Sequence, residues 1–287
     1  MSHGTVFDDR VCALGEGALW HPERNQLFWF DILNRQLLTK SPNGDQTWTF
    51  PEMVSAAGWV DHDTLLVGGQ SGFWKIDLAS GAQTRLLDLE ADNPNTRSND
   101  GRADPVGGFW VGTMGLGAED GAGAIYRYFR GEVRKLYEGV TIPNAICFAP
   151  DRKHAYFADT AQRAIWRQVI DQAGWPSGKS EVFVDYSAAG LSPDGAVCDA
   201  DGNLWVAQWG AGRVACHGPD GSFRGQVHVG ASQATCPSFG GPTLSDLFVT
   251  SAADGLGEAA LTYQPGAGKT WQAAPGIRGQ AEHRVVL

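Results

Sequence analysis

This 287-residue chain lacks the sequence features that mark several large classes of protein. Its five cysteines form no C-x-x-C pair and no zinc-finger spacing, and most lie in apolar stretches, so we expect buried free thiols. No apolar run approaches the roughly 18 residues that a membrane-spanning helix needs. The start, MSHGTVFDDR, has no basic segment followed by an apolar one, which argues against a secretory signal. We therefore expect a cytoplasmic protein with no membrane partner.

Positive charge is also scarce: the chain has 22 Lys and Arg but 32 Asp and Glu, and its formal net charge is −10. This balance argues against nucleic acid or an anionic membrane surface as a partner. The seven histidines are scattered and form no H-E-x-x-H motif, which argues against a histidine-rich zinc site. His21, His154 and His217 lie beside turns and are expected at the surface.

What the chain has instead is a repeat. A short phrase with an aliphatic and aromatic core, followed by small or polar residues, recurs six times, with 38, 44, 46, 49 and 43 residues between successive starts. Copies at this spacing are typical of a β-propeller, in which each four-stranded blade is one unit. No helical period persists, so we predict an all-β, six-bladed β-propeller that spans residues 1–287 as a single domain. The copies are LFWFDI from Leu27, LLVGGQ from Leu65, FWVGTM from Phe109, AYFADT from Ala155, LWVAQW from Leu204 and LFVTSA from Leu247.

Two polar connections interrupt this rhythm. Residues 91–101 (ADNPNTRSNDG) and residues 115–123 (GLGAEDGAG) are predicted to be long loops. Long loops in a fold of tight turns are places where function is often found. Both are therefore candidate functional segments, with a solvated connector as the alternative.

Four oxygen-bearing side chains stand at boundaries between a turn and a strand: Glu16, Asn99, Asn144 and Asp194. A propeller brings the loops of all its blades to one channel mouth, so these residues are expected to meet there. Carboxylate and amide oxygens are the ligands that hard divalent cations prefer, which makes a central metal site one interpretation. Asn and Asp are also ordinary turn residues, so the spacing alone leaves a purely structural role open.

Several longer phrases closely resemble the senescence-marker-protein/gluconolactonase/luciferin-regenerating-enzyme family of six-bladed propellers. They are GEGALWHPERNQLFWFDI, RSNDGRADPVGGFWVGTM, GAIYRY, IPNAICFAPDRKHAYFADT and SPDGAVCDADGNLWVAQWGAGRV, and they run through nearly the whole chain. The resemblance implies one divalent cation (Ca²⁺, Zn²⁺, Mn²⁺, Mg²⁺ or Fe²⁺) held by Glu16, Asn144 and Asp194.

The same resemblance implies that Arg97 and Asn99 contact the substrate. The family's further substrate-contacting Glu falls on Gly117 when counted without gaps, so the expectation passes to Glu119, two residues on. A Trp that stacks on sugar is also expected, with Trp209 the best placed.

The activity implied is hydrolysis of an aldono-1,4- or 1,5-lactone to the aldonic acid, in a non-phosphorylative pentose or hexose oxidation pathway. Asp194 is the expected proton acceptor, and water activated by the cation is the alternative base. Two other functions stay open: an organophosphate or aryl-ester hydrolase on the same metal site, and a non-enzymatic propeller that binds metal or protein. The expected partner is a small sugar lactone, on a monomer or weak homo-oligomer.

Overall fold

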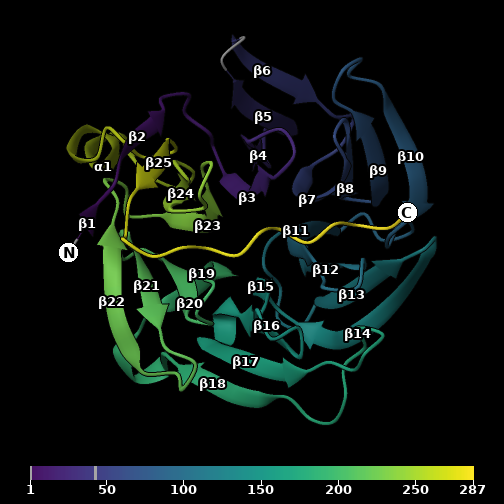
Figure 1. The fold of residues 1–287 in the computed structure, drawn as a ribbon. Helices are drawn as coiled ribbons and strands as arrows, with labels where there is room; N and C mark the ends of the chain where they lie inside the picture. The colour runs from purple at the N-terminus through teal and green to yellow at the C-terminus, as the bar shows by residue number, and fades with distance from the viewer. Residues whose placement is uncertain (1, 42–43) are drawn as a thin grey trace.

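The computed structural model describes residues 2–41 and 44–287. These residues form six β-sheets that stand in a ring, with the first strands of neighbouring sheets packed against one another around the axis (Figure 1). The arrangement confirms the predicted all-β, six-bladed propeller. Its helical segments are short: α1 (Glu258–Tyr263) and the 3-10 turns η1 (Thr160–Gln162) and η2 (Ser187–Ala189). Among the described residues, no helix is long and apolar enough to cross a membrane.

Each of the first five blades is an antiparallel sheet of four consecutive strands that runs outward from the channel. The strands of blade 1 are β3 (Gly15–His21), β4 (Gln26–Asp31), β5 (Gln36–Ser41) and β6 (Gly44–Thr49). Those of blade 2 are β7 (Val54–Asp61), β8 (Thr64–Gly69), β9 (Gly72–Asp77) and β10 (Gln83–Asp88). Blade 3 has β11 (Thr96–Ala103), β12 (Phe109–Gly115), β13 (Gly123–Phe129) and β14 (Glu132–Val140). Blade 4 has β15 (Pro143–Phe148), β16 (His154–Asp159), β17 (Ala164–Val169) and β18 (Glu181–Asp185), and blade 5 has β19 (Ser192–Cys198), β20 (Leu204–Trp209), β21 (Arg213–His217) and β22 (Phe223–His228).

The sixth blade closes the ring by joining the two ends of the chain. It combines β23 (Ala234–Gly240), β24 (Asp246–Ser251) and β25 (Thr270–Ala273) with β2 (Thr5–Asp8), which pairs antiparallel with β25. The short β1 (Ser2–His3) adds to β22 of blade 5 in parallel. This pairing ties the N-terminal strand to the last blade, so both ends of the chain are fixed in the ring.

The repeated phrase of the sequence is the second strand of every blade: β4, β8, β12, β16, β20 and β24. These strands are almost entirely buried, because each is covered on both faces by the neighbouring blades. Phe28 and Phe30 of β4, for example, share one apolar cluster with Leu65 and Val67 of β8. Burial on both faces explains why the phrase is a nearly continuous apolar run instead of an alternating one.

The prediction of a loop over residues 91–101 was wrong in its second half. Thr96–Ala103 is β11, the innermost strand of blade 3, and all eight of its residues are buried. Its polar residues hid it from a hydrophobic pattern: Arg97 and Asn99 line a cavity, and Arg102 pairs with Glu282 in the interior. The second expected loop is present, since β12 ends at Gly115 and β13 begins at Gly123.

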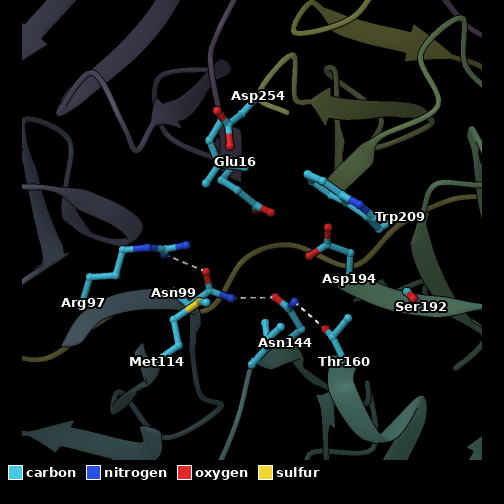
Figure 2. A pocket seen from close by; sticks show the side chains of 12 residues that line it. Glu16, Arg97, Asn99, Met114, Asn144, Thr160, Ser192, Asp194, Trp209 and Asp254 are labelled. Atoms are coloured by element: carbon cyan, nitrogen blue, oxygen red, sulfur yellow. Dashed lines mark hydrogen bonds between the residues drawn. The ribbon is translucent and has the colours of Figure 1, made fainter. Parts of the chain in front are cut away.

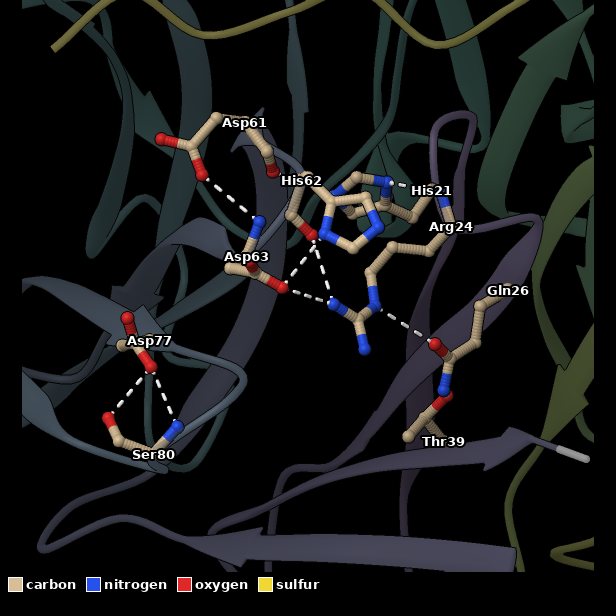
Figure 3. Close-up of polar contacts among 9 residues, drawn as sticks. All are labelled: His21, Arg24, Gln26, Thr39, Asp61, His62, Asp63, Asp77 and Ser80. Atoms are coloured by element: carbon tan, nitrogen blue, oxygen red, sulfur yellow. Dashed lines mark hydrogen bonds and ion pairs between the residues drawn. The ribbon is translucent and has the colours of Figure 1, made fainter. Parts of the chain in front are cut away.

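Two of the three histidines expected at the surface are buried, so the prediction was wrong for His21 and His217. Figure 3 shows His21 under the connection that carries Asp61, where its Nε2 lies 3.0 Å from the Asp61 carbonyl oxygen. Burial lowers the pKa of His21, which favours the neutral ring. His217 lies 2.7 Å from the hydroxyl of Tyr186. Proximity to a turn did not predict exposure, because neighbouring turns cover these rings.

All five cysteines are buried and free, which confirms the expectation for them.

The last residues of the chain cross one face of the ring (Figure 1). The amides of Val285 and Val286 donate to the carbonyls of Trp59 (2.8 Å) and Gly107 (2.9 Å), near the far ends of blades 2 and 3. Glu282 forms a buried ion pair with Arg102, which lies one residue before the end of β11. The tail therefore covers the end of the channel at which the innermost strands finish.

Candidate functional site

A cavity of about 310 Å³ opens at the other end of the channel, where the innermost strands begin (Figure 2). Its size is at the lower end of the roughly 300–1,000 Å³ that is usual for small-molecule sites. The lining combines polar groups with an apolar border. Its residues are Leu14, Glu16, Arg97, Asn99, Met114, Ile142, Asn144, Thr160, Ser192, Asp194, Trp209 and Asp254. Five of the six predicted site residues are thus brought together.

The predicted polar residues lie inside the innermost strands and not before them. In each of these strands the register with the second strand shifts, and the shift begins at Glu16 in β3, at Ser98 in β11, at Asn144 in β15 and at Pro193 in β19. Such irregularities re-aim side chains and are common beside functional sites. Here they let side chains near the start of each strand face the channel mouth while the rest of the strand stays paired.

A chain of hydrogen bonds orients the two amides. Arg97 Nη1 donates to Asn99 Oδ1 (2.9 Å), and Asn99 Nδ2 donates to Asn144 Oδ1 (3.1 Å). Asn144 Nδ2 donates to Thr160 Oγ1 (2.8 Å), whose hydroxyl donates to the Pro193 carbonyl (2.7 Å). Both amide nitrogens are therefore occupied as donors. The Asn144 oxygen keeps a lone pair, since an amide oxygen accepts two hydrogen bonds.

Two buried carboxylates, Glu16 and Asp194, face each other in the cavity. Burial and the nearby charge of Asp100 raise the pKa of Glu16 to about 8. Burial and the charge of Glu16 raise the pKa of Asp194 well above its usual range. Burial raises the pKa of Asp100 to about 6, and its oxygens accept from the amides of Gly101 (2.8 Å) and Ile146 (2.7 Å). The site thus crowds three buried carboxyl groups, whose simultaneous ionisation is unfavourable unless a positive charge is added.

Arg97 is the cationic member of the lining, and its residue is 8% exposed. Burial lowers its pKa, while the charges of Glu16 and Asp194 oppose that shift. Nη1 is also held by the Ser98 carbonyl at 2.8 Å. Figure 2 shows Arg97 and Trp209 on opposite sides of the cavity, with Asp194 on the side of Trp209.

The donor set fits a hard divalent cation. Two carboxylates that repel each other are stabilised when a dication lies between them, and the Asn144 oxygen supplies a neutral ligand of the type that Ca²⁺ and Mg²⁺ accept. In the described part of the chain, no three His, Cys, Asp or Glu side chains gather as possible metal ligands. A cation here would therefore need an amide oxygen besides Glu16 and Asp194.

Glu119 does not line this cavity. It lies in the exposed loop between β12 and β13, where its Oε2 accepts from the Gly117 amide at 3.1 Å. The structure thus leaves it apart from the other predicted site residues.

The structure also adds residues to the site that sequence reasoning missed. Met114, Thr160 and Trp209 are each the last residue of the repeated phrase in their blades, and all three line the cavity. Trp209 was expected as a stacking residue, but Met114 and Thr160 were not considered. The shared position at the end of the second strand was the signal that would have found them. Asp254, three residues after β24, had no such signal.

Comparisons with known proteins agree with this architecture. Residues 14–253 match the family model described as SMP-30/Gluconolactonase/LRE-like region. The chain is 36% identical over 289 residues to L-arabinolactonase of Azospirillum brasilense, covering 98% of this chain and 94% of the relative. It is 34% identical over 258 residues to pentonolactonase XacC of Haloferax volcanii, covering 88% and 86%. The crystal structure of a calcium-binding protein, regucalcin, from Agrobacterium tumefaciens superposes with a TM-score of 0.97 at 39% identity, covering 100% of this chain and 98% of that one.

Proposed function

The chain belongs to the SMP-30/gluconolactonase/LRE-like family, and from the chemistry of its cavity we propose that it is a metal-dependent sugar lactonase. The observation that carries the proposal is the meeting of Glu16, Asn144 and Asp194, from three blades, in one small cavity. The substrate class is also supported by the names of two relatives, an L-arabinolactonase and a pentonolactonase.

Glu16, Asn144 and Asp194 would hold the cation, which when bound supplies a Lewis acid for the lactone carbonyl oxygen. Asp194 takes a proton from the water whose oxygen bonds to the carbonyl carbon. The bond between that carbon and the ring oxygen then breaks, and the ring oxygen receives the proton as it becomes a hydroxyl. The product is the open-chain aldonic acid, with no other reactant needed.

Arg97 and Asn99 orient the substrate. The free edge of the guanidinium donates to sugar hydroxyls, while its Nη1 keeps the Asn99 amide in place. Thr160 fixes the Asn144 amide from the other side, so the oxygen of that amide stays turned to the reaction centre. Apolar side chains, Leu14, Met114 and Ile142, border the cavity and limit the water that reaches the ring. These contacts contribute positioning, which lowers the barrier without taking part in bond changes.

The direct test is a panel of arabinono-, galactono-, xylono- and gluconolactone, assayed after chelation and after addition of Ca²⁺, Mn²⁺, Zn²⁺, Mg²⁺ or Fe²⁺. We expect hydrolysis of at least one lactone, loss of that activity on chelation, and its return with at least one cation. Phenyl acetate and a fluorophosphate serve as comparison substrates. The proposal fails if no lactone is hydrolysed with any cation, or if either comparison substrate is turned over with a higher kcat/KM than every lactone.

Replacing Arg97 with Ala is expected to raise KM about tenfold and to lower kcat by less than about threefold, because a charged hydrogen bond to substrate contributes about 1.5–3 kcal/mol. Steady-state kinetics on the best lactone of the panel measure both constants. Arg224→Ala is the control, since Arg224 is exposed on β22, away from the cavity. If kcat/KM falls only because kcat falls, Arg97 stabilises the transition state and does not merely bind the substrate.

A further inference from the structure

Two side chains on one side of the cavity have no part in the hydrolysis described above. Trp209 is the last residue of β20 in blade 5, and Asp254 lies in the loop that follows β24 in blade 6. Both line the cavity, and Figure 2 shows Asp254 beside Glu16 and the Trp209 ring beside Asp194. The Asp254 loop rests on the segment before β3, where the amides of Ala253 and Asp254 donate to the Ala13 carbonyl (3.0 and 2.9 Å). Asp254 therefore enters the cavity from the side of Glu16.

One buried residue fixes both of them. Gln233 forms an antiparallel bridge with Trp209, and its side-chain Nε2 donates to the carbonyl of Asp254 at 3.0 Å and to that of Ala252 at 3.2 Å. The residue is 7% exposed, so these hydrogen bonds are shielded from water. The backbone positions of Trp209 and Asp254 are thus set together, although they come from different blades.

The polar groups of this pair are left without partners. Asp254 is exposed at the rim and Trp209 is half-buried, and within residues 2–41 and 44–287 no group hydrogen bonds to the Asp254 carboxylate or to Trp209 Nε1. The Asp254 carboxylate accepts hydrogen bonds and Trp209 Nε1 donates one. The Trp209 indole also offers a flat apolar face. Hydroxyl groups both donate and accept, and the C–H face of a sugar packs on an aromatic ring, so the pair complements an uncharged polyol.

We propose that Trp209 and Asp254 form a clamp for the uncharged polyhydroxyl end of the lactone, and that Asp254 selects against lactones with a terminal phosphate or other anion. The inference rests on the proposed lactonase function and names its substrate class. A phosphate at this end would meet the Asp254 carboxylate, while Arg97, the cationic residue of the lining, lies on the side opposite Trp209. Specificity then comes from repulsion of the wrong substrate as well as from contacts to the right one.

The test compares the best neutral lactone of the panel with its terminal phosphate ester, for wild type and Asp254→Asn. Asn keeps the shape and an acceptor oxygen but removes the charge. We expect kcat/KM for the neutral lactone to fall about threefold and that for the phosphate ester to rise about fivefold, as hydrogen-bond strength and like-charge repulsion of this order imply. The neutral-to-phosphate preference therefore falls by more than about tenfold. If the ester is not turned over measurably, its competitive inhibition constant replaces kcat/KM.

Asp201→Asn is the matched control, since Asp201 is an exposed aspartate in the turn between β19 and β20, at the end of the channel covered by the tail. It should leave the preference within about twofold of wild type. Trp209→Phe keeps a ring but loses the N–H, and is expected to raise KM for the neutral lactone with the cation affinity unchanged. The clamp is wrong if Asp254→Asn leaves the preference unchanged while wild type hydrolyses neutral lactones. If the wild-type protein hydrolyses no lactone, the proposed lactonase function itself is wrong.

Discussion

Asp194→Asn is expected to lower kcat by at least about 10²-fold at saturating cation, which is the scale of losing a general base. Asn keeps the shape and one oxygen ligand but removes the charge that accepts a proton. The fold should survive, because Asp194 lies on β19 at a register shift and packs against the cavity, not against the apolar core. Lactone hydrolysis at increasing cation concentration, together with the unfolding midpoint, separates lost chemistry from lost binding or lost structure.

Glu16→Gln is the matched variant. Because Glu16 would act only as a ligand, excess cation should restore most of the activity that Glu16→Gln loses. The activity that Asp194→Asn loses should not return. An Asp194→Asn protein with near-normal turnover at saturating cation would contradict the assignment of Asp194 as the base. Equal rescue of both variants would assign Asp194 to cation binding alone.

Glu282→Gln is expected to destabilise the protein by about 3–5 kcal/mol, because it leaves the buried guanidinium of Arg102 without its partner. The two side chains are 8% and 7% exposed, so water replaces little of the lost interaction. The tail would also lose one of its anchors to the innermost strand β11. Urea unfolding of wild type and variant gives the difference in free energy.

Glu181→Gln provides the control, because the Arg167–Glu181 pair is exposed (31% and 62%) and should contribute less than about 1 kcal/mol. A double variant, Arg102→Met with Glu282→Gln, should be more stable than the sum of the two single changes, since it removes both charges of the pair together. A Glu282→Gln protein as stable as the Glu181→Gln control would show that the tail pair is not a structural anchor.

The fold could be predicted because its pattern is local. Each second strand is buried on both faces, so it appears in the sequence as a short apolar run at a regular interval, whatever the rest of the chain does. The innermost strands are less visible, because one end of each carries polar residues. Thr96–Ala103 was taken in part for a loop for this reason. The meeting of Glu16, Asn144 and Asp194 in one cavity could be anticipated, because closure of six blades brings the innermost strands together at one mouth; their role as ligands stays a prediction.

Other parts of the site depend on contacts that no local pattern contains. Asp254 reaches the cavity because its loop binds the Ala13 carbonyl and the Gln233 side chain, while Glu119 is held in its own loop by the Gly117 amide. The pairing of Glu282 with Arg102 likewise requires the tail to cross the ring.

The sequence by itself thus determined the repeat, the buried second strands and which polar residues stand near the starts of the innermost strands, since burial and residue chemistry act over a few neighbouring positions. Tertiary structure alone decided that Asp254 lines the cavity while Glu119 does not, and that Arg102 and Glu282 form a buried ion pair. Those outcomes depend on how loops and tail from different blades pack once the ring is closed.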